Sequence, residues 1–214
     1  MKYCKFGRTG LEVSQVVFGG GKVGGILIDA DDDTRRRAIR SALDAGINWI
    51  DTAALYGEGR SERALGWLLG EIADEPYLST KFRIDTSRLD DIPGQIERSL
   101  HVSLERLQRQ SVDLYQLHNH IETATDATHA LSPKDVLRVA DGLDAMRTQG
   151  LIRFAGITAI GDAASCCTVI ASGRFDSAQV YYNMLNPSAG QAVPQGWSAH
   201  DFSGILAACR NHGV

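Results

Sequence analysis

The chain has 214 residues, of which 43% are hydrophobic and 22% charged, the composition of an ordinary globular protein with one sizeable core. Its net charge of −4 comes from acidic and basic residues mixed along the sequence, so a basic nucleic-acid surface is excluded and a small-molecule partner is expected. The sequence has no signal-peptide pattern and no uncharged run of the ~20 residues that span a bilayer, so we expect a cytoplasmic protein without a membrane partner.

Short apolar runs predict the β-strands. Each run is mostly apolar rather than alternating, which is typical of strands that are buried on both faces. In chain order the predicted strands are Gln15–Gly19, Asn48–Asp51, Tyr77–Lys81, Val112–His118, Phe154–Ile157 and Ser177–Tyr181.

Longer amphipathic segments between these runs predict helices. The clearest one has Ser132 as a capping residue, Pro133 at the first helical position and Gly150 as the stop. The other predicted helices are Asp32–Ala45, Ser61–Leu69, Asp90–Leu107, Ala163–Ala171 and Asp201–Asn211. Strands and helices therefore alternate in six βα units, and this order predicts an α/β fold with a parallel sheet.

Polar residues at the strand ends distinguish a barrel from an open sheet. Asp51, Lys81 and His118 each close one of three successive predicted strands. Polar groups from several strand ends that converge at one mouth are typical of a (β/α)8 TIM barrel. We therefore expect residues 1–214 to form a single barrel domain with about six of the eight βα units. Asn211 to Gly213 indicate a helix stop, and Val214 would begin a seventh strand.

A dinucleotide-binding open sheet is the rival interpretation. Gly19, Gly21 and Gly24 satisfy the pattern G-x-G-x-x-G directly after the first predicted strand. In that motif the third glycine lies inside a helix whose N-terminus receives a pyrophosphate. Here the segment "ILIDADDD" intervenes, and its aspartates would repel the anion. The pattern is therefore weak evidence for that fold.

Four residues form a set with a shared chemical purpose. A tyrosine is a poor acid at neutral pH, but a neighbouring ammonium group stabilises the phenolate and makes the phenol a stronger acid. Tyr56 can then give a proton to a carbonyl oxygen that receives a hydride, with Lys81 and Asp51 as its tuning pair. His118 would hydrogen-bond the same oxygen and orient it.

The segments "GINWIDTAALYGEGRSERALG", "LSTK", "SVDLYQLHN" and "AQVYYNMLNPSA" resemble the aldo-keto reductases, and in particular their L-galactose dehydrogenase-like branch. The resemblance implies carbonyl reduction or alcohol oxidation on aldehydes, ketones or sugars, with NADP(H) favoured over NAD(H). It also implies a catalytic tetrad of Asp51, Tyr56, Lys81 and His118. The cofactor-binding residues that it implies are Gly20, Gly21, Asp51, Thr158 and Gln179. This chain has Ala159 where the family commonly has an asparagine.

Other functions stay open. A barrel of about six units would leave two strand edges unpaired, so the chain can also be an inactive barrel fragment, or a binding module that self-associates or is completed by another chain. In an aldolase-like barrel Lys81 would instead form a Schiff base, although the adjacent Asp51 favours a charged lysine. No metal is expected, because the remaining histidines form no H-x-x-x-H pair.

Overall fold

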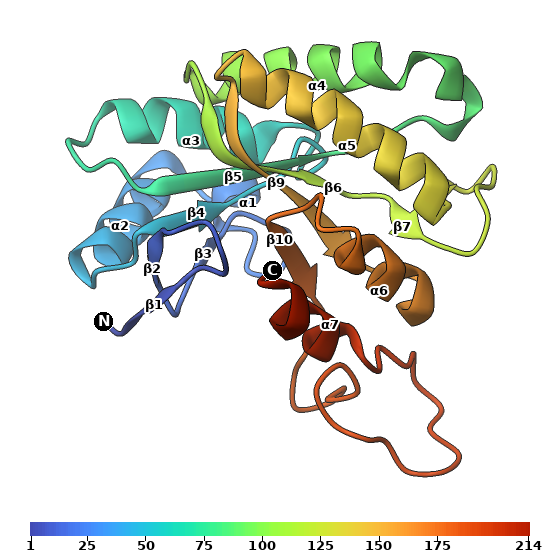
Figure 1. Ribbon diagram of the computed structural model, residues 1–214. Coiled ribbons are helices and arrows are strands. Elements are labelled where there is room, and N and C mark those ends of the chain that lie inside the picture. The colour runs from blue at the N-terminus through green and yellow to red at the C-terminus, as the bar shows by residue number, and fades with distance from the viewer.

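The computed structural model describes residues 1–214 and is built around a parallel sheet of six strands in the order β10-β9-β6-β5-β4-β3. Every pairing in this sheet is parallel. The sheet curves but does not close, since β3 and β10 are its two edges and do not pair with each other (Figure 1). The strands are β3 (Phe18–Gly19), β4 (Trp49–Asp51), β5 (Tyr77–Phe82), β6 (Val112–Leu117), β9 (Ile152–Ala159) and β10 (Ser177–Val180).

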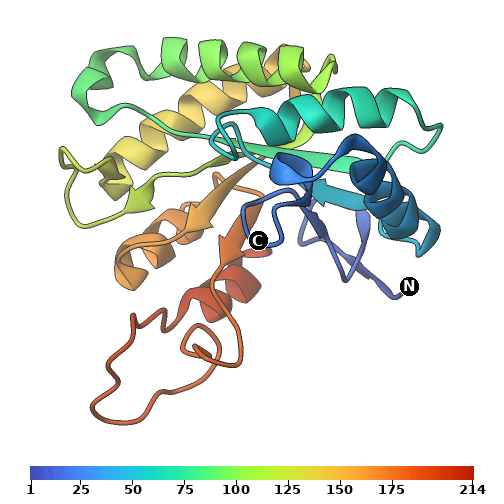
Figure 2. The ribbon, with the colours of Figure 1, turned by 180° about the vertical axis from the view of Figure 1, so that it is seen from behind.

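Helices follow the strands and cover the outer face of the sheet. Figures 1 and 2 show α3, α4 and α5 lying together over one face, while α7 lies at the β10 edge. The main helices are α2 (Asp32–Asp44), α3 (Arg60–Gly70), α4 (Ile92–Leu107), α5 (Pro133–Thr148), α6 (Ala163–Ala171) and α7 (Ile205–His212). A short α1 (Ile26–Asp29) and a 3-10 helix (Thr86–Asp91) precede α2 and α4. No helix combines the length and apolarity needed to cross a bilayer.

Side-chain caps explain where several helices begin. The Ser132 hydroxyl accepts a hydrogen bond from the Asp135 amide at 3.3 Å, and Pro133 occupies the first turn, as the sequence predicts. Asp162 caps α6 by accepting from the Ser165 amide at 2.7 Å. The predicted alternation is confirmed for the six strands of the main sheet and the helices α2 to α7.

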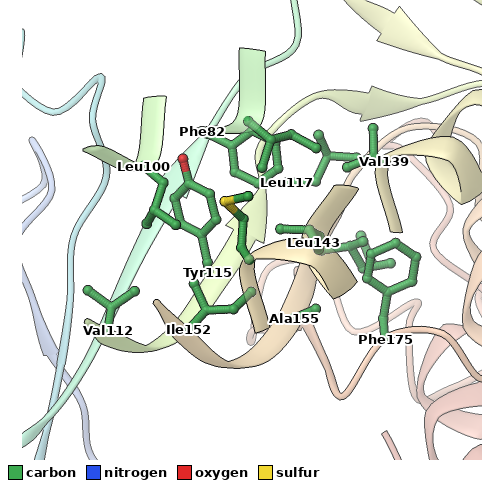
Figure 3. Packing of buried hydrophobic residues seen from close by; sticks show 14 of the residues in the cluster. Phe82, Leu100, Val112, Tyr115, Leu117, Val139, Leu143, Ile152, Ala155 and Phe175 are labelled. Carbon is green, nitrogen blue, oxygen red and sulfur yellow. The ribbon is translucent and has the colours of Figure 1, made fainter. Parts of the chain in front are cut away.

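The hydrophobic core lies between the outer face of the sheet and its covering helices (Figure 3). Phe82 from β5 stacks on Tyr115 from β6 with ring centroids 4.4 Å apart. Val139 and Leu143 of α5 are fully buried against this layer. Because each such side chain contributes about 1.5–3 kcal/mol on burial, this layer holds the strand ends in fixed positions.

An N-terminal hairpin, absent from the predicted elements, closes the amino-terminal end of the sheet. Its strands are β1 (Tyr3–Lys5) and β2 (Glu12–Ser14), which pair antiparallel. Phe6, Leu11 and Val13 pack there against Trp49 and Leu114 from the inner face of the sheet. The inner face therefore has an apolar floor.

Two further details differ from the sequence prediction. Val214 does not begin the expected seventh strand, because its amide bonds back to the Cys209 carbonyl at 3.0 Å across Gly213, whose φ of 67 ends α7. The long segment between β6 and α5 carries a small parallel pair that was not expected, formed by β7 (His120–Ile121) and β8 (Ala130–Leu131).

Candidate active site

The four predicted catalytic residues come together at the carboxyl ends of the central strands. Asp51 is the last residue of β4, Lys81 lies near the end of β5, and His118 directly follows β6. Tyr56 lies in the loop between β4 and α3. Parallel strands bring their carboxyl ends to one edge, which is why residues 30 or more positions apart meet here.

Lys81 is the centre of this group. Its side chain has no exposed surface, and its ammonium nitrogen lies 2.5 Å from Oδ2 of Asp51. The same nitrogen donates to the Thr52 carbonyl at 2.8 Å and lies 3.4 Å from the phenol oxygen of Tyr56. The positive ammonium group of Lys81 therefore lies close to the tyrosine oxygen, and the Asp51 carboxylate compensates its charge.

The second carboxylate oxygen of Asp51 is also occupied. Oδ1 accepts a hydrogen bond from the Ser79 hydroxyl at 2.6 Å and a longer one from the Gln116 amide at 3.4 Å. Asp51 and Ser79 are directly paired residues of β4 and β5, so the parallel register itself sets this contact. The carboxylate is held on both sides.

His118 lies beside Tyr56 with its ring nearly perpendicular, at 84°, and a centroid separation of 6.1 Å. Partial burial, together with the nearby positive charges of Lys81 and Arg83, lowers the pKa of His118 from 6.5 to about 4. The imidazole is therefore neutral at pH 7. Its Nδ1 atom is buried and has no hydrogen-bond partner in the protein.

A cavity of about 360 Å³ lies over Tyr56 and His118. Thr158 and Gln179, two of the residues expected to bind a cofactor, also line this cavity. The remaining lining residues, which sequence reasoning did not select, are Ile160, Val180, Tyr181, Tyr182 and Asn183. Most of these lie in the segment "AQVYYNMLNPSA" quoted above. Their position at the end of a predicted strand could have indicated that they line the site. Asp51 lines a second cavity of about 360 Å³ below this one, and Gln179 borders both.

Gly20, Gly21 and Thr158, three of the expected cofactor residues, each make specific contacts in this structure. Gly20 is buried, and a Cβ atom at this position would lie 2.6 Å from the Ser61 hydroxyl. At Gly21 a Cβ atom would lie 3.4 Å from the Tyr56 ring, so this glycine borders the catalytic phenol. The Thr158 hydroxyl donates to the Leu117 carbonyl at 3.1 Å, which leaves its oxygen free to accept. Ala159 is fully buried in the core on the outer face.

A sequence profile described as "Aldo/keto reductase family" matches residues 15–214, almost the whole chain. The chain belongs to the aldo/keto reductase family. Among solved structures, the aldo-keto reductase AKR11C1 from Bacillus halodurans superposes with a TM-score of 0.74 at 24% identity and covers 100% of this chain and 64% of that one. This likeness confirms the aldo-keto reductase barrel fold, here as a six-stranded part of it.

Curated relatives of the aldo/keto reductase family align over part of their length. The "Uncharacterized oxidoreductase YrpG" of Bacillus subtilis is 36% identical over 58% of this chain and 42% of its own length. The L-galactose dehydrogenase of Arabidopsis thaliana is 32% identical over 72% of this chain and 47% of its own length. The chain therefore spans less than half the length of these two relatives. A D-threo-aldose 1-dehydrogenase of a Pseudomonas species is 27% identical over 94% of this chain and 66% of its own length.

Proposed function

We propose that this chain carries the site of an NAD(P)H-dependent oxidoreductase that interconverts aldehydes or ketones and alcohols by hydride transfer. The observation that carries the proposal is the buried Lys81 ammonium, which lies 2.5 Å from Asp51 and 3.4 Å from the Tyr56 phenol. Membership of the aldo/keto reductase family supports the same chemistry.

In the proposed mechanism Tyr56 is the general acid. When bound, the nicotinamide cofactor supplies the hydride to the carbonyl carbon. Tyr56 donates its proton to the carbonyl oxygen, and the Lys81 ammonium stabilises the phenolate that remains. Asp51 compensates the lysine charge throughout the cycle. In alcohol oxidation the same phenolate accepts the hydroxyl proton.

We assign His118 the role of orienting the substrate. Its imidazole is neutral, since burial lowers its pKa to about 4, so it carries no charge that would compete with Lys81. A neutral imidazole has one N–H group, which can donate a hydrogen bond to the carbonyl oxygen. That bond strengthens as negative charge develops on the oxygen in the transition state.

The residues around the cavity fit a nicotinamide. Gln179 offers an amide that can both donate to and accept from a carboxamide, and the Thr158 oxygen can accept one hydrogen bond. Gly21 brings its backbone close to the Tyr56 ring, and we propose that Gly21, Gly20 and Asp51 complete the cofactor site. NADP(H) is proposed in preference to NAD(H) on the basis of the family resemblance. We propose that these residues act within one incomplete barrel domain, 1–214, in the cytoplasm.

The proposed substrates are small aldehydes, ketones or sugars. Two relatives are named for sugar oxidation, the L-galactose dehydrogenase and the D-threo-aldose 1-dehydrogenase. A polar hollow of about 520 Å³, lined by Arg83 and by residues that follow β6, supports a hydroxyl-bearing substrate, because most of its lining side chains can hydrogen-bond. They are Arg83, His120, Glu122, Thr123, Asp126 and Thr128.

Substitution of Tyr56 by phenylalanine tests the proposal. The variant should lose carbonyl reduction by at least about 100-fold, the range that general acid catalysis supplies, because only the acidic proton is removed. Its affinity for NADPH, followed by nucleotide fluorescence, should remain within about twofold. Tyr3→Phe is the matched control, since Tyr3 is exposed and distant in the N-terminal hairpin. Unchanged turnover in Tyr56→Phe would contradict the assigned role.

A second candidate is a binding module without activity, completed by another chain. The observation that favours it is the open sheet, in which β3 and β10 each have one edge without a strand partner. Unpaired strand edges are templates for pairing with a further chain. A solution mass above that of one chain, together with no binding of NADPH or NADH, would favour this candidate. Micromolar binding of either nucleotide would favour the enzyme.

A further inference from the structure

A line of hydrogen bonds runs from the floor of the sheet to the catalytic pair. The indole Nε1 of Trp49 donates to the Ser79 hydroxyl at 3.0 Å, and that hydroxyl donates to Oδ1 of Asp51 at 2.6 Å. The Lys81 ammonium then donates to Oδ2 of Asp51 and to the Tyr56 phenol oxygen. Trp49 and Ser79 are only 4% and 1% exposed.

The direction of each bond in this line is determined by chemistry. An indole nitrogen can only donate, so the Ser79 oxygen must be the acceptor from Trp49. The single hydroxyl hydrogen of Ser79 is then left for the Asp51 carboxylate. A short hydroxyl-to-carboxylate bond of this kind is charge-assisted and stronger than a neutral one.

The start of the line is held by packing. The Trp49 ring lies between Phe6 of the N-terminal segment and Tyr77 at the start of β5, with centroid distances of 4.8 and 5.8 Å. Trp49 and Asp51 point to the same inner face because they are two residues apart on β4. Rotation of the indole would break both aromatic contacts, so its N–H group stays aimed at Ser79.

We propose that Trp49 and Ser79 are positioning residues for the catalytic group, and that they act by orienting the Asp51 carboxylate and its negative charge. The inference rests on the proposed function of Tyr56. A hydroxyl donor on Oδ1 draws negative charge away from Oδ2 and keeps that oxygen directed at Lys81. The ammonium field at the Tyr56 phenol is then less quenched by the carboxylate.

Other groups that can influence the phenol are few. Lys81 faces it from β5, His118 from the end of β6, and Asp51 from β4 behind the lysine. The remaining charged or titratable neighbours are Arg83 beside His118 and the two tyrosines of the cavity wall, Tyr181 and Tyr182. Of the groups named here only Asp51 is hydrogen-bonded to Ser79, so a change at Ser79 reaches Tyr56 through Asp51 and Lys81.

The test is an ultraviolet difference titration of Tyr56, obtained by subtracting the curve of the corresponding Tyr56→Phe protein. In Ser79→Ala the phenol ionisation should move to higher pH by about half a unit or more, because the Asp51 carboxylate loses its short hydroxyl donor and offsets the Lys81 charge more strongly. Trp49→Phe should shift it less and in the same direction. Ser79→Thr keeps the hydroxyl and should restore the original curve. Where turnover is measurable, kcat should show the same pH shift with KM little changed.

Ser103→Ala is the matched control. Ser103 is also completely buried, but it lies on α4 and its hydroxyl has no hydrogen-bond partner. An unmoved Tyr56 titration in both folded Ser79→Ala and folded Trp49→Phe would overturn the inference. The titration needs neither cofactor nor turnover. A failure of the proposed function would be seen separately, as retained carbonyl reduction in Tyr56→Phe.

Discussion

Lys81 and Asp51 form an ion pair of 2.5 Å in which the lysine side chain has no exposed surface and the aspartate side chain only 13%. Removing one partner of a buried pair leaves the other charge without compensation, which costs about 3–5 kcal/mol. Asp51→Asn should therefore lower the free energy of unfolding by about that amount, as measured by urea denaturation, although the two side chains have the same shape.

A surface pair provides the comparison for this prediction. Asp29 is paired with Arg60 at 3.1 Å, but both side chains are more than half exposed. Asp29→Asn should change stability by less than about 1 kcal/mol, because water screens exposed pairs. Equal losses in the two variants would show that burial does not strengthen the Asp51–Lys81 pair.

His118 should make stability depend on pH. Its pKa is about 4 in the folded protein, against 6.5 for an ordinary histidine, because burial disfavours the charged ring. As pH falls from 6.5 toward 4, unfolded chains bind a proton at this site before folded ones do. The contribution of neutral His118 to the free energy of unfolding is therefore fully present above pH 6.5 and is lost as the pH falls through this range. The full shift corresponds to about 3 kcal/mol, and partial exposure of the ring reduces the expected loss to roughly 1–2 kcal/mol.

The variant His118→Asn isolates this contribution from the carboxylates that titrate in the same range. Its unfolding free energy should fall less between those pH values than that of the unaltered protein. His101→Asn, on the exposed side of α4, should leave the pH dependence unchanged. Parallel curves for the unaltered protein and His118→Asn would contradict the lowered pKa of His118.

Replacement by alanine should change stability in opposite directions at two glycines of α3. A Cβ atom on Gly66 would lie 2.3 Å from the Arg106 carbonyl of α4, whereas a Cβ atom on Gly70 would meet nothing within 4 Å. Gly66→Ala should cost about 1–3 kcal/mol through overpacking, despite the better helix propensity of alanine. Gly70→Ala should be neutral or stabilise by up to about 1 kcal/mol. Thermal unfolding of both variants checks the pair, and a stabilised Gly66→Ala would contradict close α3–α4 packing.

The succession of strands and helices and the start of α5 could be predicted because they depend on local signals. Ser132 and Pro133 predicted the beginning of α5 correctly, since capping acts within one turn. The start of α7 was placed too early, at Asp201, because Gly204 has φ 86 and the helix begins only after it. The first strand proved shorter than predicted, and Val16 and Val17 remain 52% and 46% exposed. An apolar run does not by itself produce pairing at a sheet edge.

Asp51, Lys81 and His118 meet in space because each lies at the carboxyl end of a parallel strand, and Tyr56 joins them from the loop after β4. The support of Asp51 by Ser79 could not be predicted in this way, because it depends on the register that pairs these two residues. The N-terminal hairpin was missed for a different reason. The three residues of β1 are all exposed, and such a strand leaves no hydrophobic pattern in the sequence.

Gln179 should determine part of the affinity for the nucleotide. It is exposed on the edge strand β10 and lines the cavity over Tyr56, so its amide is free to bond a nicotinamide carboxamide. Gln179→Ala should weaken NADPH binding by about 3- to 10-fold, the loss expected for about one hydrogen bond, without a change in stability. Gln149→Ala, at the exposed end of α5, should bind as the unaltered protein does. Fluorescence titrations of both variants measure this effect, and equal dissociation constants would remove Gln179 from the proposed cofactor site.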